Sequence, residues 1–100
     1  MRFQFKNKKL EALYTEERDA HKYPPGVVSA FFEVMAVIQG ALDERDLYAL
    51  KGLRYEKLAG GAARREQHSL RLNKQFRLIV ERARDDDGLY LLIVNIEDYH

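Results

Sequence analysis

The sequence predicts an α+β domain in which two or three N-terminal helices pack on a mostly antiparallel sheet of four to five strands. Two changes in periodicity support this prediction. From Val27 to Leu42 the apolar residues recur at helical spacing, whereas from Arg54 onward apolar and polar residues alternate. In addition, residues 85–88 (DDDG) separate two apolar runs, which is typical of a β-hairpin. We therefore expect helices first and an antiparallel meander after them.

The first half of the chain is predicted to form one strand and three helices. Phe3 and Phe5 alternate with polar neighbours, which favours a short strand. A helix is expected over residues 9–17, before a break at residues 23–26 (YPPG). The main helix is expected over residues 27–42 and a short one over residues 43–52. The main helix carries a broad apolar stripe, which indicates packing against a sheet: Val27, Phe31, Val34, Ile38 and Leu42, widened by Val28, Met35 and Ala41.

The second half is predicted to supply the rest of the sheet. Strands are expected over residues 55–58, 67–73, 76–81 and 89–96, with a flexible loop at 59–62. One face of these strands would take the helices. It would carry Leu70, Leu72, Phe76, Leu78 and Val80, whereas Ser69, Arg71, Asn73, Arg77, Ile79 and Glu81 would lie on the other face. We expect that other face to offer Arg71, Asn73 and Arg77 to solvent, with Lys57 as a further candidate.

Composition excludes several classes of protein. One hundred residues form one domain, 1–100, and 46% hydrophobic residues suffice for a single core, while 33% charged residues keep the surface solvated. The absence of cysteine excludes disulfides and thiolate chemistry. No segment approaches the ~20 apolar residues that span a bilayer, and the first residues lack the apolar run of a signal peptide. We expect a cytoplasmic protein that does not associate with membranes. No ligand spacing indicates a metal, and no cofactor is expected.

Charge is unevenly distributed although the net charge is only +1. Residues 51–84 contain ten Lys or Arg against three acidic residues, a difference of +7, whereas residues 85–100 contain five acidic residues and no Lys or Arg. A basic block of this size points to a partner that carries phosphate groups. A solvated polar face is the alternative explanation.

The residues Tyr99-His100 follow an apolar run at 89–94 that is predicted to be a buried strand. Histidine is the side chain whose ordinary pKa lies near neutral pH, so His100 is a candidate for proton transfer. A solvated terminal residue without a function is the alternative.

Three motifs carry a family resemblance. They are residues 55–60 (YEKLAG), 68–78 (HSLRLNKQFRL) and 95–100 (NIEDYH), and they resemble the HigB group of the RelE/ParE toxin superfamily. The resemblance implies a RelE-like, microbial-ribonuclease-like fold and a type II toxin that cuts messenger RNA on the translating ribosome without a metal. It also implies a HigA-like helix-turn-helix antitoxin as partner, with operator DNA contacted only through the complex with that antitoxin.

The resemblance also implies the residues of the site. Lys57, Arg77, Tyr99 and His100 match positions that serve catalysis in the family, and Arg71 and Asn73 match positions that line the same site. The basic block adds further candidates for RNA binding, namely Arg54, Arg64, Arg65 and Lys74.

The expected chemistry uses the 2′-hydroxyl of RNA as nucleophile. Arg77 suits the phosphate because its guanidinium is a permanently charged fork. His100 is the candidate acid for the leaving 5′-oxygen, and the carboxylates around it would favour its protonated form. Lys57 is either a base, if Arg71 and Arg77 lower its pKa, or an electrostatic stabiliser. Tyr99 is expected to stack on a base or to orient the phosphate.

Two other functions remain open at this stage. One is a toxin of the ParE type, which poisons DNA gyrase without being an enzyme. The other is a plain RNA-binding module that uses a basic sheet. The pair Tyr99-His100 together with Lys57 favours the nuclease, because a protein that only binds does not need a proton donor there. A binding sheet usually exposes aromatic residues for stacking, and here the aromatic residues fall mainly at helix or core positions.

Overall fold

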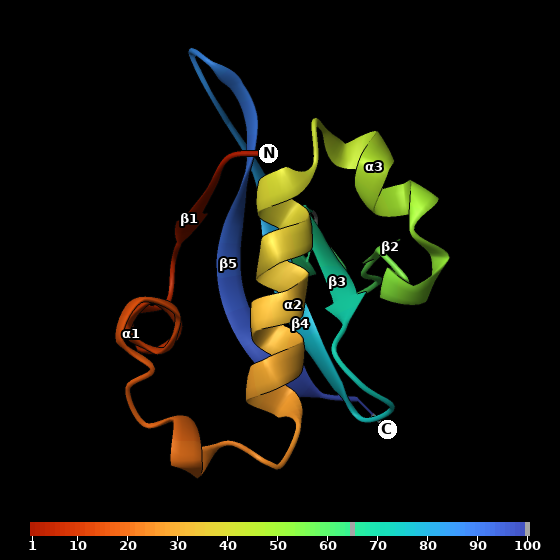
Figure 1. Ribbon diagram of the computed structural model, residues 1–100. Helices are drawn as coiled ribbons and strands as arrows, with labels where there is room; N and C mark the ends of the chain where they lie inside the picture. The colour runs from red at the N-terminus through yellow and green to blue at the C-terminus, as the bar shows by residue number, and fades with distance from the viewer. Residues whose placement is uncertain (65, 100) are drawn as a thin grey trace.

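A computed structural model describes residues 1–64 and 66–99. Within them, five strands form one sheet in the order β1-β5-β4-β3-β2 (Figure 1). The pair β1–β5 is parallel, and all the other pairs are antiparallel. The predicted mostly antiparallel sheet is confirmed. The strands are β1 (Phe3–Phe5), β2 (Glu56–Lys57), β3 (Gln67–Arg71), β4 (Phe76–Asp85) and β5 (Gly88–Asp98).

The predicted helices are also present in the described part of the chain. They are α1 (Lys8–Glu16), α2 (Val27–Gly40) and α3 (Glu44–Ala49), with short 3₁₀ turns η1 (Ala20–Lys22), η2 (Lys51–Leu53) and η3 (Ala62–Arg64). Figure 1 shows α2 lying across the sheet, with α1 on the side of β1 and α3 on the side of β3. The side chain of Asn7 caps α1 by accepting hydrogen bonds from the backbone N–H groups of Lys9 and Leu10.

The apolar stripe of α2 forms the centre of the core, with one exception. Val27, Phe31 and Ile38 are completely buried, as predicted. Leu42 was expected to continue this stripe, and this expectation is wrong, since 90% of Leu42 is exposed. The helix ends at Gly40, and Ala41 adopts an extended backbone that carries the chain off the helical path. Glycine weakens the last turn of a helix, and the register of the stripe is lost with that turn.

The sheet is buried on both faces near its centre. Ser69 and Ile79 were expected on the solvent face, but they are only 1% and 0% exposed. They are paired across β3 and β4. The side chain of Arg64 crosses this face, because it hydrogen-bonds Gln67 on β3 and forms an ion pair with Glu97 on β5. It therefore spans β4 on this face and ties η3 to it.

A partly buried polar cluster lies between α3 and the sheet. The carboxylate of Glu44 accepts hydrogen bonds from the Tyr55 hydroxyl at 2.7 Å and from the Arg82 guanidinium at 2.9 Å. His68 stacks on the Tyr55 ring and lies 3.2 Å from the Tyr48 hydroxyl. Burial raises the pKa of the Tyr55 phenol, and the hydrogen bond to Glu44 adds to this. Burial lowers the pKa of His68, so the neutral imidazole is the form that suits the fold.

This burial predicts a pH dependence of stability. We expect the free energy of unfolding to fall as the pH drops below ~6.5, the ordinary pKa of histidine. Below that pH the unfolded chain binds a proton at His68, whereas the folded chain, in which the pKa is lowered, binds it only at lower pH. Urea unfolding at several pH values measures how steeply the free energy of unfolding changes with pH. The variant His68→Phe, which keeps a ring against Tyr55, is the matched control. If both proteins show the same slope, His68 is not its source.

Candidate functional site

A pocket of about 250 Å³ opens where β3 ends and the chain leaves β5. Two of its residues come from strands β3 and β4, and two come from the turn between them. The others follow η2 and β5. Its lining consists of Arg54, Arg71, Asn73, Lys74, Arg77 and Tyr99. All six were candidates from the sequence, and they are separated by up to forty-five positions in the chain.

The antiparallel register explains why two of the arginines meet. Arg71 and Arg77 are direct partners across β3 and β4. Their neighbours Leu70 and Leu78, also partners, are completely buried in the core. Because side chains alternate along a strand, both arginines lie on the opposite face. The sequence pattern that buries the leucines therefore places the two guanidinium groups at one site.

Arg77 is the best-positioned cation of the pocket. Its Nη2 donates a hydrogen bond of 2.5 Å to the backbone carbonyl of Arg54, and its guanidinium lies 5.5 Å from the centre of the Tyr99 ring. The backbone of Arg54 is in the left-handed region, with φ 47°, at the end of η2. The Nε of Arg77 is buried without a hydrogen-bond partner among the described residues. A buried donor without a partner is uncommon in proteins, and it suits a ligand that brings an acceptor.

The turn between β3 and β4 is held by Asn73. Its side-chain oxygen accepts hydrogen bonds from the backbone N–H groups of Gln75 and Phe76, at 2.9 and 2.8 Å. The backbone N–H of Tyr99 in turn donates to the carbonyl of Gln75. Asn73 therefore fixes the turn that holds Tyr99, and its amide nitrogen is the part that is left to meet a ligand. This structural role was not expected from the sequence.

The charge of the pocket has one sign. Four of the six lining residues are cations, and none is a carboxylate. Guanidinium groups bind phosphate oxygens with two parallel hydrogen bonds, and clustered cations of this kind favour ligands with several negative charges. The pocket is therefore suited to a phosphate group, with an aromatic ring at its edge.

Comparison with known proteins gives the family. The model of the RelE-like toxins of type II toxin–antitoxin systems, HigB, matches residues 3–100. The chain belongs to this family. A relative, toxin HigB-1 of Vibrio cholerae serotype O1, is 33% identical over 81 residues, which cover 81% of this chain and 83% of that protein. The resemblance noted in the sequence is thus confirmed, and the protein is a HigB-like toxin of a type II toxin–antitoxin system.

The fold of the toxin agrees with a solved structure of this class. The YoeB/ParE toxin from Agrobacterium tumefaciens superposes with a TM-score of 0.56 at 12% identity, over the full length of both chains. The RelE-like α+β fold that the sequence predicts is therefore confirmed.

Lys57 lies outside the pocket of the toxin. It is exposed on β2, where its partner across the sheet is His68. Since His68 contacts Tyr48 of α3, Lys57 lies on the helix-bearing side of the sheet. The expectation that Lys57 stands on the open face beside Arg71 and Arg77 is wrong. The two-residue strand β2 takes its facing from its register with β3, and a shift of one residue reverses the face.

Three further residues that the sequence suggested for the site are Arg64, Arg65 and His100. Arg64 does not line the pocket, since its guanidinium is held by Glu97 at 3.1 Å and by Gln67. Arg65 and His100 lie outside the described residues.

Among the residues that the structure does describe, no group of three or more His, Cys, Asp or Glu residues could hold a metal ion. No helix in the same part of the chain is long and apolar enough to cross a membrane.

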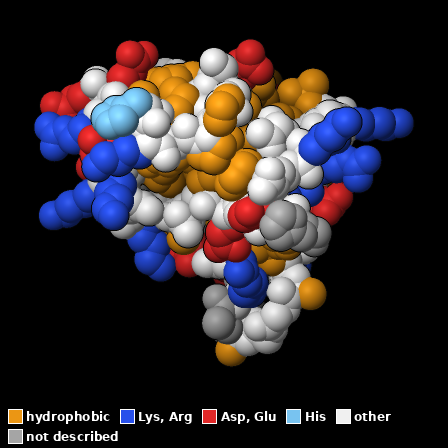
Figure 2. All heavy atoms as spheres, turned by 90° about the horizontal axis from the view of Figure 1, so that it is seen from below, with side chains coloured by type: hydrophobic (Ala, Val, Ile, Leu, Met, Phe, Trp, Pro, Cys, Tyr) orange, Lys and Arg blue, Asp and Glu red, His pale blue; other side chains and the backbone are white. Residues whose placement is uncertain are grey.

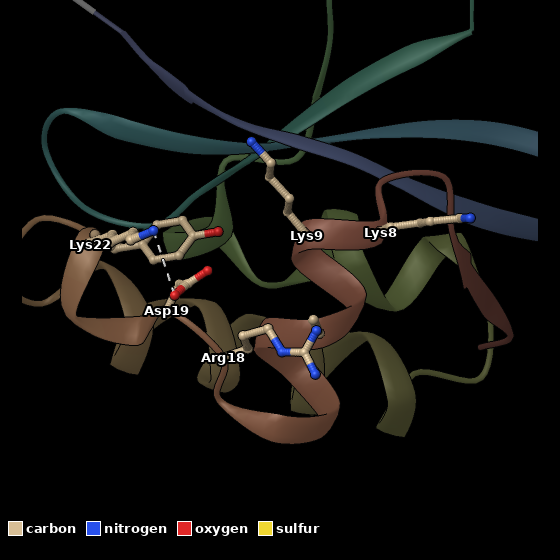
Figure 3. A pocket seen from close by; sticks show the side chains of 7 residues that line it. Lys8, Lys9, Arg18, Asp19 and Lys22 are labelled. Atoms are coloured by element: carbon tan, nitrogen blue, oxygen red, sulfur yellow. Dashed lines mark ion pairs between the residues drawn. The ribbon is translucent and has the colours of Figure 1, made fainter.

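A second group of cations was not expected from the sequence. Lys8, Lys9, Arg18 and Lys22 line a pocket between α1 and η1 (Figure 3). They belong to the first fifty residues, which are nearly neutral with seven basic and eight acidic side chains. The net charge of this part of the sequence does not reveal the group, because the fold brings together cations that lie up to fourteen positions apart. The adjacent pair Lys8-Lys9 was its only local signal.

Proposed function

We propose that this toxin is a metal-independent endoribonuclease that cleaves messenger RNA on the translating ribosome and so inhibits translation. The observation that carries the proposal is the pocket at the end of β3, in which Arg77 is held between the carbonyl of Arg54 and the ring of Tyr99. The membership of the chain in the family of RelE-like toxins also supports the proposal.

The proposed reaction is an internal displacement at phosphorus. The 2′-hydroxyl loses its proton to water, the 2′-oxygen attacks the adjacent phosphorus, and the bond to the 5′-oxygen breaks. Arg77 binds the phosphate and stabilises the charge that develops on it, which is the contribution expected from a fixed cation. Arg71, Lys74 and Arg54 hold the neighbouring phosphates. His100 delivers a proton to the leaving 5′-oxygen. The products are a 2′,3′-cyclic phosphate and a free 5′-hydroxyl.

The role of Lys57 follows from its position. A base for the 2′-hydroxyl has to reach it directly or through one water. Lys57 lies on the other side of the sheet from Arg71 and Arg77. We therefore propose that Lys57 acts as an electrostatic stabiliser that attracts RNA at the edge of the sheet, and that it is not the base.

The proposed partners follow from the family and the reaction. A HigA-like helix-turn-helix antitoxin would neutralise the toxin, and only the complex of the two would contact operator DNA. Ribosomes and messenger RNA would be the targets, which places the activity in the cytoplasm.

Expression of the toxin without an antitoxin tests the proposal. We expect growth to stop and translated transcripts to be cut, because cleavage of messenger RNA removes the templates for protein synthesis. Mapping of RNA 5′ ends before and after induction measures this. A toxin that acts on DNA gyrase would leave transcripts intact while DNA breaks accumulate, and a plain RNA-binding protein would leave both intact.

A further inference from the structure

Arg77 has a glutamate as its direct neighbour in the sheet. Arg77 on β4 is the partner of Arg71 on β3 and of Glu97 on β5. Residues that lie opposite each other in an antiparallel pair share one face of the sheet, with Cβ atoms about 4.5–5.5 Å apart. Glu97 is therefore on the face of the two arginines. Opposite charges at such positions attract, so the register alone predicts an ion pair between Glu97 and Arg77.

The guanidinium of Arg77 nevertheless has no carboxylate partner among the described residues. Its Nη2 donates to the carbonyl of Arg54, and its Nε has no hydrogen-bond partner in the same part of the chain. This is unusual for the molecule. Acidic side chains are interspersed with Lys and Arg on the face that Figure 2 shows, and arginines such as Arg2 and Arg82 pair with carboxylates. The fork of Arg77 is thus left for an anion from solution.

The carboxylate of Glu97 is paired with Arg64 instead. Nη2 of Arg64 donates a hydrogen bond of 3.1 Å to Oε1 of Glu97. The two side chains are 34% and 30% exposed, so solvent screens this ion pair less than it screens fully exposed pairs. Glu97 does not line the pocket that holds Arg77. Arg64 therefore neutralises the carboxylate that the register places beside Arg77.

Further contacts hold Arg64 in this position. Its Nη1 donates to the side-chain oxygen of Gln67 at 3.1 Å, and the amide nitrogen of Gln67 donates to Glu81 at 2.9 Å. Lys6 also pairs with Glu81, at 3.2 Å. A network of several charges contributes more to stability than an isolated surface ion pair. The position of Arg64 therefore does not depend on Glu97 alone.

Gly60 leaves the space that the stem of Arg64 needs. Its φ is 137°, a backbone conformation that residues with a side chain rarely adopt. A Cβ atom on Gly60 would lie 3.3 Å from Cγ and from Cδ of Arg64. The backbone of the loop at 59–62 therefore packs against the methylene groups of Arg64.

We propose that Arg64 is a positioning residue of the pocket, which holds Glu97 away from Arg77 and so keeps the guanidinium of Arg77 available to the phosphate of RNA. This inference rests on the proposed function for the nature of the ligand. Arg64 acts through Glu97 and does not itself contact the RNA, in contrast to the direct contact that the basic block of the sequence suggested. Without Arg64, Glu97 has Arg77 as its cross-strand partner, and a carboxylate paired with Arg77 competes directly with a phosphate.

The test is a pair of substitutions at Arg64 and Glu97. We expect Arg64→Ala to weaken RNA binding at least about tenfold, the loss of one charge-assisted contact, and to reduce the salt slope of log K by about 0.7, the share of one phosphate on a single strand. We expect Glu97→Gln in the same chain to restore both, because glutamine keeps the shape of the side chain but has no charge to pair with Arg77. The probe is a short single-stranded RNA with 2′-O-methyl groups, which can be bound but not cut, measured over a salt series.

The matched control is Arg64→Ala with Glu33→Gln, which restores the same net charge at an exposed position of α2. We expect no recovery of RNA binding in this control. Equal recovery in both double variants would reduce the effect to net charge and overturn the inference. Binding that stays weak in the variant with Arg64→Ala and Glu97→Gln would show that Arg64 contacts RNA itself, and this would overturn the inference too. So would unchanged binding by Arg64→Ala alone.

The melting temperature of each variant separates this role from a purely structural one. Recovery of RNA binding by Glu97→Gln is expected without recovery of the melting temperature, because the second substitution does not replace the contacts of Arg64. If Arg64→Ala does not fold, Glu97→Gln alone carries the test. It is expected to bind RNA at least as tightly as the wild type, and a loss of about tenfold would overturn the inference.

Cleavage of ribosome-bound messenger RNA by the same variants separates this inference from the proposed function. If the wild type cuts RNA and Arg64→Ala binds and cuts normally, the positioning role fails and the nuclease stands. If RNA binding follows the expected pattern without any cleavage, the nuclease fails and the positioning role stands. A wild-type toxin that does not bind the probe would overturn the inference.

Discussion

The substitution His100→Gln is expected to reduce cleavage of ribosome-bound messenger RNA by roughly 10²- to 10⁴-fold, the contribution of one positioned acid. Glutamine can hydrogen-bond the leaving oxygen but cannot give it a proton. The fold is expected to survive, because the buried core residues of β5 are Leu91 and Ile93, and Ile96, which also packs against the core, lies four positions before His100. Single-turnover cleavage, with the melting temperature as a control of folding, measures the effect.

The outcome of this experiment decides the role of His100. A folded His100→Gln protein that cuts at the wild-type rate would show that the residue is not the acid. A fall in the melting temperature by several degrees would instead show that His100 contributes to the stability of the fold. The proposal requires a large loss of rate with an unchanged melting temperature and unchanged binding of RNA.

The second large effect is expected at Arg77. Removal of a fixed donor that meets developing charge costs about 10²- to 10³-fold in rate, so Arg77→Ala should reduce cleavage by that factor. Arg77→Lys should recover only part of the loss, because lysine keeps the charge but lacks the fork that reaches both the Arg54 carbonyl and a phosphate. Single-turnover rates at saturating toxin separate this effect from weaker binding.

The matched control for this series is Arg84→Ala. Arg84 is an exposed arginine on the same strand, close to the hairpin and outside the pocket. Its removal is expected to leave the rate unchanged. If Arg77→Ala and Arg84→Ala lose the same small factor, the pocket at the end of β3 is not the reaction site.

The site could be predicted from the sequence where strand alternation is long and regular. Leu70 and Leu78 mark the core face, and Arg71 and Arg77 therefore fall together on the other. The hairpin at residues 85–88 is also confirmed, because its turn residues predict it locally. Gly88 takes the positive φ of 107° that the turn requires. The apolar stripe of α2 is confirmed as far as Ile38.

The sequence-based predictions are wrong or incomplete where contacts between distant parts of the chain decide which way a side chain faces or which residues meet. The facing of Lys57 depends on the register between β2 and β3, which two residues of strand cannot specify. Ile79 is buried on the face that Arg64 crosses to reach Glu97, and this long-range ion pair leaves no local signal in the sequence. The group of cations at α1 and η1 depends on how α1 packs, and its cations are diluted by acidic neighbours in the sequence.

The chemistry of the cut ends tests the central claim most directly. Messenger RNA bound to ribosomes is treated with the purified toxin, and the ends of the fragments are identified. The account predicts a 2′,3′-cyclic phosphate on the upstream fragment and a free 5′-hydroxyl on the downstream fragment, because the RNA supplies its own nucleophile. A 5′-phosphate would show that water is the nucleophile and contradict the account, and so would messenger RNA that stays intact.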